Sequence, residues 1–195
     1  MRNIKDELVY DPACYQRDAL RAELGYGPED RVILFGGLLR EHKGVYELLR
    51  LLEHLDDRRY RLLFIASRPS PEQERLASLA REPGARVRVL PAQDRTGMAR
   101  MNLAADVVIL WLDPAVPASH YQMPYKATDA LAMGTPIIAN PISDLGEWVA
   151  VLVSDPGVCR AGPAQLLDVG SRDVNGILRS VKPWPTAPCN SATAA

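Results

Sequence analysis

Short apolar runs alternate with segments of helical periodicity along the first 150 residues of the chain. Each run has four or five residues, a length typical of a strand. The runs predict strands at residues 31–35, 62–66, 87–90, 106–110 and 136–139. In most of these runs, polar residues do not alternate with apolar ones. Such runs favour strands that are buried on both faces of a parallel sheet.

The segments between the apolar runs have the period of an amphipathic helix. After Gly44, four apolar residues at positions i, i+3, i+4 and i+7 share one helix face. They are Val45, Leu48, Leu49 and Leu52. Further helices are predicted near residues 16–24, 71–81, 95–103, 124–133 and 145–149. Strands that alternate with helices predict an α/β protein with a single Rossmann-like, doubly wound parallel sheet.

The same pattern divides the chain into three parts. Residues 1–30 are mostly polar and linker-like, with one short helix, and residues 31–155 form the predicted Rossmann-like domain. Residues 156–195 are predicted to be an irregular, partly disordered tail, because several prolines near its end oppose regular structure.

Charge and composition exclude several classes of function. The 195 residues include 23 Lys and Arg against 24 Asp and Glu, so the formal net charge is −1 and no overall basic field attracts nucleic acid. The three cysteines are far apart and predict neither a metal pair nor a disulfide. Scattered cysteines suit a reducing compartment, so we expect a cytoplasmic protein. No apolar run is long enough to span a bilayer, and the N-terminus does not resemble a secretory signal.

The first candidate site follows the first predicted strand. Gly36 and Gly37 come directly after the apolar run, and Lys43 stands near the start of the next helix. Glycines let the backbone approach a ligand, and a lysine at a helix N-terminus attracts phosphate. The loops after parallel strands meet at one edge of the sheet, where ligands bind. A glycine pair after a strand is more often only a turn, so these residues alone leave both interpretations open.

The second candidate site is the helix predicted near Pro124. Proline suits the first helical turn, because its missing N–H would have no partner there. Lys126 and Asp129 are three residues apart and share one face of this helix. The free N–H groups of the first turn, together with Lys126, would suit a diphosphate. An exposed ion pair between Lys126 and Asp129 is the alternative, and it stays open at this point.

These loops, in this order and spacing, resemble the C-terminal domain of the retaining "group 1" glycosyltransferases, a family with the two-domain GT-B fold. Residues 36–44 are similar to the family loop that holds the donor diphosphate, and residues 124–136, which end in Gly-Thr-Pro, are similar to its donor helix. The resemblance spans residues 31–149. It implies a diphosphate site made by Gly36, Gly37, Lys43, Pro124 and Lys126, and a ribose site at Asp129. Further candidate ligands are Arg40, His120, Met123 and Tyr125.

Two positions depart from the family pattern. Leu38 stands where the family has a loop arginine, for which Arg40 or Lys126 would substitute. Tyr121 stands where the family has the first of two acids, near the transferred sugar, so we assign no catalytic residue. A dehydrogenase or epimerase is disfavoured, because no Gly-x-Gly-x-x-Gly follows the first strand.

The resemblance implies a glycosyltransferase donor domain that binds a nucleotide-diphosphate sugar. No cofactor or metal is expected, because lysines and the helix dipole would neutralise the diphosphate. The family's acceptor-binding domain has no counterpart in the sequence, so we expect a missing or separate acceptor domain and no activity for this chain alone. The alternative is a non-catalytic nucleotide-binding or interaction module, or a truncated, inactive remnant.

Two further expectations concern the contacts of such a domain. The nucleotide base is expected near Ser67 and residues 91–93, in the loops after the second and third strands. Many relatives act on lipid-linked acceptors, which would bring the complete enzyme to a membrane. No basic amphipathic helix of this chain supports a membrane contact of its own.

Overall fold

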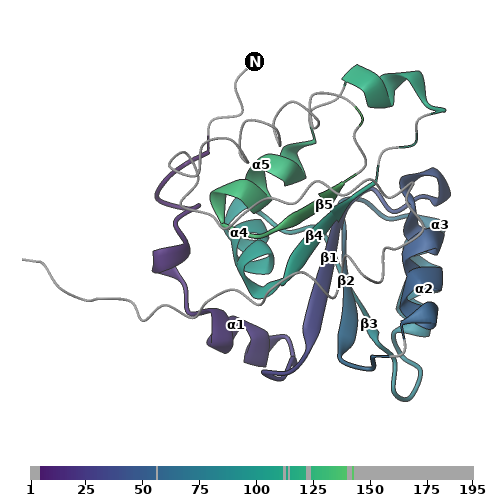
Figure 1. Ribbon diagram of the computed structural model, residues 1–195, viewed down its shortest axis with the longest axis horizontal. Helices are drawn as coiled ribbons and strands as arrows, with labels where there is room; N and C mark the ends of the chain where they lie inside the picture. Colours follow the sequence, from purple (N-terminus) through teal and green to yellow (C-terminus); the bar gives the residue numbers. More distant parts are fainter. Residues whose placement is uncertain are drawn as a thin grey trace, which may run out of the picture.

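The computed structural model describes residues 5–55, 57–111, 113, 115–121, 124–139 and 142. In this part of the chain, five strands form one sheet in the order β3-β2-β1-β4-β5 (Figure 1). They are β1 (Arg31–Gly37), β2 (Tyr60–Ala66), β3 (Val87–Leu90), β4 (Val107–Leu110) and β5 (Ile137–Ala139). All neighbouring strands are parallel, which confirms the expected fold class.

The order of the strands reverses beside β1. On one side β1 pairs with β2, where Ile33 lies opposite Leu62, and on the other it pairs with β4, where Ile33 lies opposite Val107. The chain therefore winds outward in both directions from β1. The carboxyl ends of β1 and β4 form the switch point at which open α/β sheets bind their ligands.

Helices cover both faces of the sheet (Figure 1). One face carries α2 (Val45–His54) and α3 (Pro71–Leu79), and the other carries α1 (Arg17–Glu23), α4 (Arg95–Ala104) and α5 (Tyr125–Ala132). Within the described residues, short 3-10 helices lie before α1, at Pro12–Cys14, and in two connections, at Glu41–Lys43 and Pro117–Tyr121. None of the helices in the described residues is both long and apolar enough to cross a membrane.

Two apolar layers form the core, one under each set of helices. Along β1, Val32 and Leu34 belong to the layer under α1, α4 and α5, whereas Ile33 and Phe35 belong to the layer under α2 and α3. The ring of Phe35 packs edge-on against that of Phe64, with 5.9 Å between the ring centroids. All of these side chains are buried, as a continuous apolar run predicts for a central parallel strand.

A buried ion network joins α1 to the sheet. The carboxylate of Asp106 accepts hydrogen bonds from Arg17 Nη2 (2.7 Å), from Arg21 Nη1 (3.1 Å) and from the backbone N–H of Val32 (2.7 Å). Arg21, only 4% exposed, also donates to the backbone carbonyls of Gly27, Asp30 and Ala104. Part of the segment expected to be linker-like is therefore held firmly against the sheet.

Some expectations concern other parts of the chain. The helix predicted at residues 145–149 and the tail predicted at residues 156–195 lie outside the described residues. The division of the chain into three parts stays a prediction.

Candidate functional site

Two consecutive glycines end β1 at the switch point. The backbone of Gly37 has a φ of 129°, a conformation that favours glycine. A Cβ atom built on Gly37 would lie 3.4 Å from Lys126 Nζ, and one built on Gly36 would lie 3.4 Å from the Cε of Met98. The glycine pair therefore does more than turn the chain, because it lets the Lys126 ammonium lie close to the backbone of β1.

The loop after Gly37 brings Lys43 to the start of α2. Its 3-10 helix, Glu41–Lys43, ends at Gly44, whose φ of 78° is left-handed. A Cβ atom on Gly44 would lie only 2.8 Å from Cγ and Cδ1 of Trp111, the residue that follows β4. The contact between Gly44 and Trp111 thus joins the two sides of the switch point and fixes the backbone next to Lys43.

Lys126, the second residue of α5, lies beside Lys43. Its Nζ is 4.4 Å from the centroid of the Phe35 ring, a cation–π contact at the end of β1. Burial, and then the positive charge of Lys43, lower the pKa of Lys126 from 10.5 to about 8. Among the side chains that the structure describes, no carboxylate forms an ion pair with either lysine. Two adjacent cations without an anion favour a ligand with two negative charges, such as a diphosphate.

Pro124 precedes α5 rather than opening it. Its ψ of 121° is extended and the helix begins at Tyr125, so the expected position of the proline in the first turn is wrong by one residue. The ring fixes only φ, which at −66° suits both the helix and the residue before it. The N–H of Ala127 donates to the Pro124 carbonyl at 2.9 Å, and the positive end of the α5 dipole still lies beside Lys126.

Asp129 is buried one turn further along α5 and pairs with Lys5. Its Oδ1 accepts a hydrogen bond from Lys5 Nζ. An exposed ion pair between Lys126 and Asp129 is therefore wrong, because Asp129 is 7% exposed and has another partner. The Lys5 ammonium also lies 5.1 Å from the ring centroid of Tyr10 and 5.8 Å from that of Tyr125. Burial and the neighbouring Asp129 carboxylate raise the pKa of Tyr10, so its hydroxyl stays protonated.

A hollow of about 330 Å³ opens beside Asp129. Its walls come from the N-terminal segment, from α5, from the loop after β3 and from the start of α4, and they include Tyr10, Gln93 and Arg95. This Asp129 hollow connects the carboxylate expected to hold a ribose with part of the loop expected to hold a base. No cluster of three His, Cys, Asp or Glu side chains suited to a metal ion occurs in the described part of the chain.

The comparison with protein families decides the class of this protein. Residues 16–155 match the family described as "Glycosyl transferases group 1". The chain belongs to the group 1 glycosyltransferases. The D-inositol 3-phosphate glycosyltransferase of Xylanimonas cellulosilytica is 37% identical over 134 residues, which cover 66% of this chain and 30% of that relative. The expected family is confirmed, and the shared region amounts to less than a third of that relative.

Solved structures have the same fold. Anabaena Alr3699/HepE in complex with UDP-glucose aligns with a TM-score of 0.56 at 19% identity, over 75% of this chain and 39% of that one. The C-terminal domain of the group 1 protein LpcC from Francisella tularensis aligns with a TM-score of 0.52 at 16% identity, over 83% of this chain and 94% of that one. This group 1 glycosyltransferase chain therefore has the Rossmann-like fold of one half of a GT-B enzyme.

Three of the four remaining candidates lie in the described residues. Arg40 is exposed and has extended backbone before the 3-10 helix of the first loop, and His120 is exposed in the 3-10 helix before α5. Tyr125 is 67% exposed and lines the Asp129 hollow. Met123 lies outside the described residues. Their roles in this glycosyltransferase stay predictions.

The structure brings two residues to the site that sequence reasoning missed. Lys5 and Tyr10 come from the segment expected to be linker-like, yet both line the Asp129 hollow. No motif or periodicity marks either residue, since a lysine in a polar segment is ordinary. Only the packing of the N-terminal segment against α5 reveals them.

Proposed function

We propose that this chain is the donor-binding domain of a group 1 glycosyltransferase and binds a nucleotide-diphosphate sugar. The observation that carries the proposal is the pair formed by Lys43 and Lys126 at the switch point of the sheet, for which the described residues supply no anionic partner. The UDP-glucose in the structure of Alr3699/HepE supports the ligand class, because that protein shares the fold.

In this proposal the domain acts by electrostatic stabilisation. When the bond between sugar and diphosphate breaks, negative charge develops on the leaving diphosphate. Lys43, Lys126 and the N-terminus of α5 stabilise that charge in a site from which water is partly excluded. The neutralisation comes from these groups, so the proposal needs no metal or cofactor. The acceptor is held by a domain other than this one.

Asp129 holds the ribose hydroxyls in this proposal, and the base occupies the Asp129 hollow. Because Asp129 pairs with Lys5, the nucleotide has to displace the Lys5 ammonium from the carboxylate. The carboxylate is already positioned on a helix one turn from Lys126, so phosphate and ribose would be held by the same element.

A second candidate function is a nucleotide-binding module that does not transfer sugar. The observation that favours it is Tyr121, which is 89% exposed and occupies the position of the first acid in the family pattern. Tyrosine has no carboxylate, so it cannot take the role that the family assigns to the acid near the transferred sugar. Such a module would bind the nucleotide through the same lysines without activating the sugar.

Calorimetry with UDP-glucose, GDP-glucose and ADP-glucose tests the donor site. We expect the full 195-residue chain to bind at least one of the three, and to bind the matching nucleoside without phosphates much more weakly. Absence of binding to all three at about 1 mM, in protein shown to be folded by circular dichroism, would contradict the proposal. Transfer of sugar after addition of an acceptor domain separates the enzyme from the non-catalytic module.

Replacing Lys5 by methionine is expected to tighten binding of the nucleotide sugar. The change removes the cation that competes for Asp129, and loss of such a partly exposed ion pair corresponds to about fivefold in affinity. Titration calorimetry of Lys5→Met beside the unchanged chain measures the effect. Arg50→Met, which removes an exposed charge of α2, is the matched control and should leave the affinity unchanged. Weaker binding by Lys5→Met would mean that Lys5 contacts the ligand instead.

A further inference from the structure

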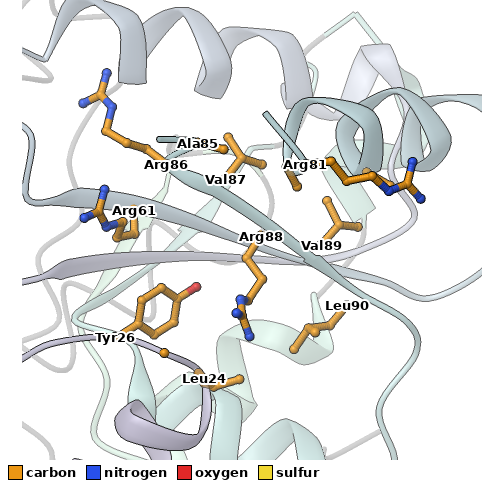
Figure 2. A pocket seen from close by; sticks show the side chains of 13 residues that line it. Leu24, Tyr26, Arg61, Arg81, Ala85, Arg86, Val87, Arg88, Val89 and Leu90 are labelled. Carbon is orange, nitrogen blue, oxygen red and sulfur yellow. The ribbon is translucent and has the colours of Figure 1, made fainter. Parts of the chain in front are cut away.

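A second hollow, of about 530 Å³, lies along the edge of the sheet at β3 (Figure 2). β3 is the end strand, with β2 as its sheet neighbour. The walls come from residues 24–26, from the start of β2, from the end of α3 and from β3 itself. None of Lys43, Lys126 and Asp129 lines this β3 pocket, so it is distinct from the proposed donor site.

The β3 pocket carries an excess of positive charge. Its lining includes Arg61, Arg81, Arg86 and Arg88. Arg61 Nε donates to Asp30 Oδ1 at 2.9 Å, which offsets one of the four charges. Arg86 donates to backbone carbonyls at the end of α2, which satisfies its hydrogen bonds without cancelling its charge. Burial, followed by the charges of Arg58 and Arg61, lowers the pKa of Arg86, as expected where cations gather.

Arg88 is the cation of this group that is best placed for a ligand. It extends from β3 toward Tyr26 (Figure 2), and its guanidinium carbon lies 6.0 Å from the centroid of the Tyr26 ring. Within the described part of the chain, no carboxylate forms an ion pair with Arg88. Its planar group therefore keeps paired N–H donors of the kind that bind carboxylate or phosphate oxygens.

The Tyr26 hydroxyl provides an independent indication of a ligand. Tyr26 is 9% exposed and lines the β3 pocket, yet its hydroxyl has no hydrogen-bond partner among the described residues. A buried hydroxyl without a partner is uncommon, because it loses its bonds to water without compensation. Burial raises the pKa of Tyr26 to about 12, so this hydroxyl is a hydrogen-bond donor at neutral pH.

We propose that the β3 pocket binds a small ligand with at least two negatively charged oxygens, held by Arg88 and the Tyr26 hydroxyl. Arg86 adds long-range attraction, whereas the charge of Arg61 is offset by Asp30. The volume of the pocket falls within the range of about 300–1,000 Å³ typical of small-ligand sites. The shared chemistry is an oxyanion, which a phosphate compound or a polycarboxylate supplies.

Nuclear magnetic resonance titration of the ¹⁵N-labelled chain tests this site. Pyrophosphate and citrate are added separately, in a Lys43→Met/Lys126→Met background so that the proposed donor site does not compete. We expect saturable shifts of the backbone amides of Tyr26 and residues 86–90 with at least one of the two anions. The anion with the higher affinity identifies the phosphate or the carboxylate class. Absence of saturable shifts at these amides up to about 10 mM of both anions would overturn the proposal.

Three substitutions make the test specific. Arg88→Met should lower the affinity for the anion at least tenfold, because charge-assisted hydrogen bonds are lost. Arg88 is exposed, so this change should leave the chain folded. Tyr26→Phe should lower the affinity for the anion, because it removes a hydrogen-bond donor. The same change should raise the melting temperature of the anion-free chain, because it removes an unsatisfied buried hydroxyl. Arg50→Met should change neither the affinity for the anion nor the melting temperature. If Arg50→Met lowered the affinity as much as Arg88→Met, the anion would be attracted by general charge alone, and the proposal would be overturned.

Discussion

Replacing Asp106 by alanine is expected to lower the free energy of unfolding by about 3–5 kcal/mol. The carboxylate is buried and hydrogen-bonded to Arg17, Arg21 and the N–H of Val32. Alanine would leave the guanidinium groups inside the protein without an anion, and it would remove the acceptor of a backbone N–H. Because domains of this size are only about 5–15 kcal/mol more stable than their unfolded chains, much of the stability would be lost. Urea denaturation followed by circular dichroism measures the change.

Asp57→Ala is the matched control for this loss. Asp57 also binds an arginine, since its carboxylate accepts hydrogen bonds from the guanidinium and the backbone N–H of Arg59, but the two side chains are 32% and 50% exposed. Water screens such a pair, so its removal should change the free energy of unfolding by less than about 1 kcal/mol. Equal losses for the two variants would show that burial adds nothing to the Asp106 network.

Replacing Lys126 by methionine is expected to weaken the binding of a nucleoside diphosphate by about 10- to 100-fold at pH 7. Methionine keeps the apolar part of the side chain near Phe35 but removes the ammonium that lies over Gly37. Titration calorimetry measures the loss, with the nucleoside diphosphate that corresponds to the preferred nucleotide sugar. An unchanged affinity would mean that the diphosphate binds away from the switch point.

The lowered pKa of Lys126 adds a test of the same site by pH. In the free protein this lysine loses its proton near pH 8, and only the charged form attracts the diphosphate. The affinity should therefore fall as the pH rises from 7 to 9, and Lys126→Met should lose this dependence. Lys43→Met removes a neighbouring positive charge, so it should move the midpoint to higher pH. A midpoint that stays in place would contradict the adjacency of the two lysines.

Much of the fold is predictable from local patterns. The apolar run at residues 87–90 coincides with β3, and the other four predicted strands differ from the observed ones by at most two residues at either end. Continuous apolar runs specify strands that are buried on both faces, and such a signal lies within a few neighbouring residues. Pro124 shows where local reasoning ends, because a ring that fixes φ leaves ψ, and thus the helix start, undetermined.

The pairing of charged residues is not predictable in this way. Asp129 is bonded to Lys5, 124 positions away, although Lys126 stands one helical turn before it. Asp106 is paired with Arg17 and Arg21, which come from a segment without any obvious motif. These choices depend on burial and on the packing of distant segments, which sequence spacing does not encode. The resemblance to a family likewise carried no information on the cations that accompany each carboxylate.

The anchoring of α1 determines where this domain can be cut for protein engineering. A fragment that starts at β1 would lack Arg17 and Arg21 and would leave the Asp106 carboxylate without the cations that pair with it. Chimeras that exchange this domain between relatives should therefore join their parents before residue 16, even though the first strand begins only at Arg31. A junction placed after α1 would combine Asp106 of one parent with Arg17 and Arg21 of the other. Such a chimera would report the loss of stability of the domain rather than its ligand specificity.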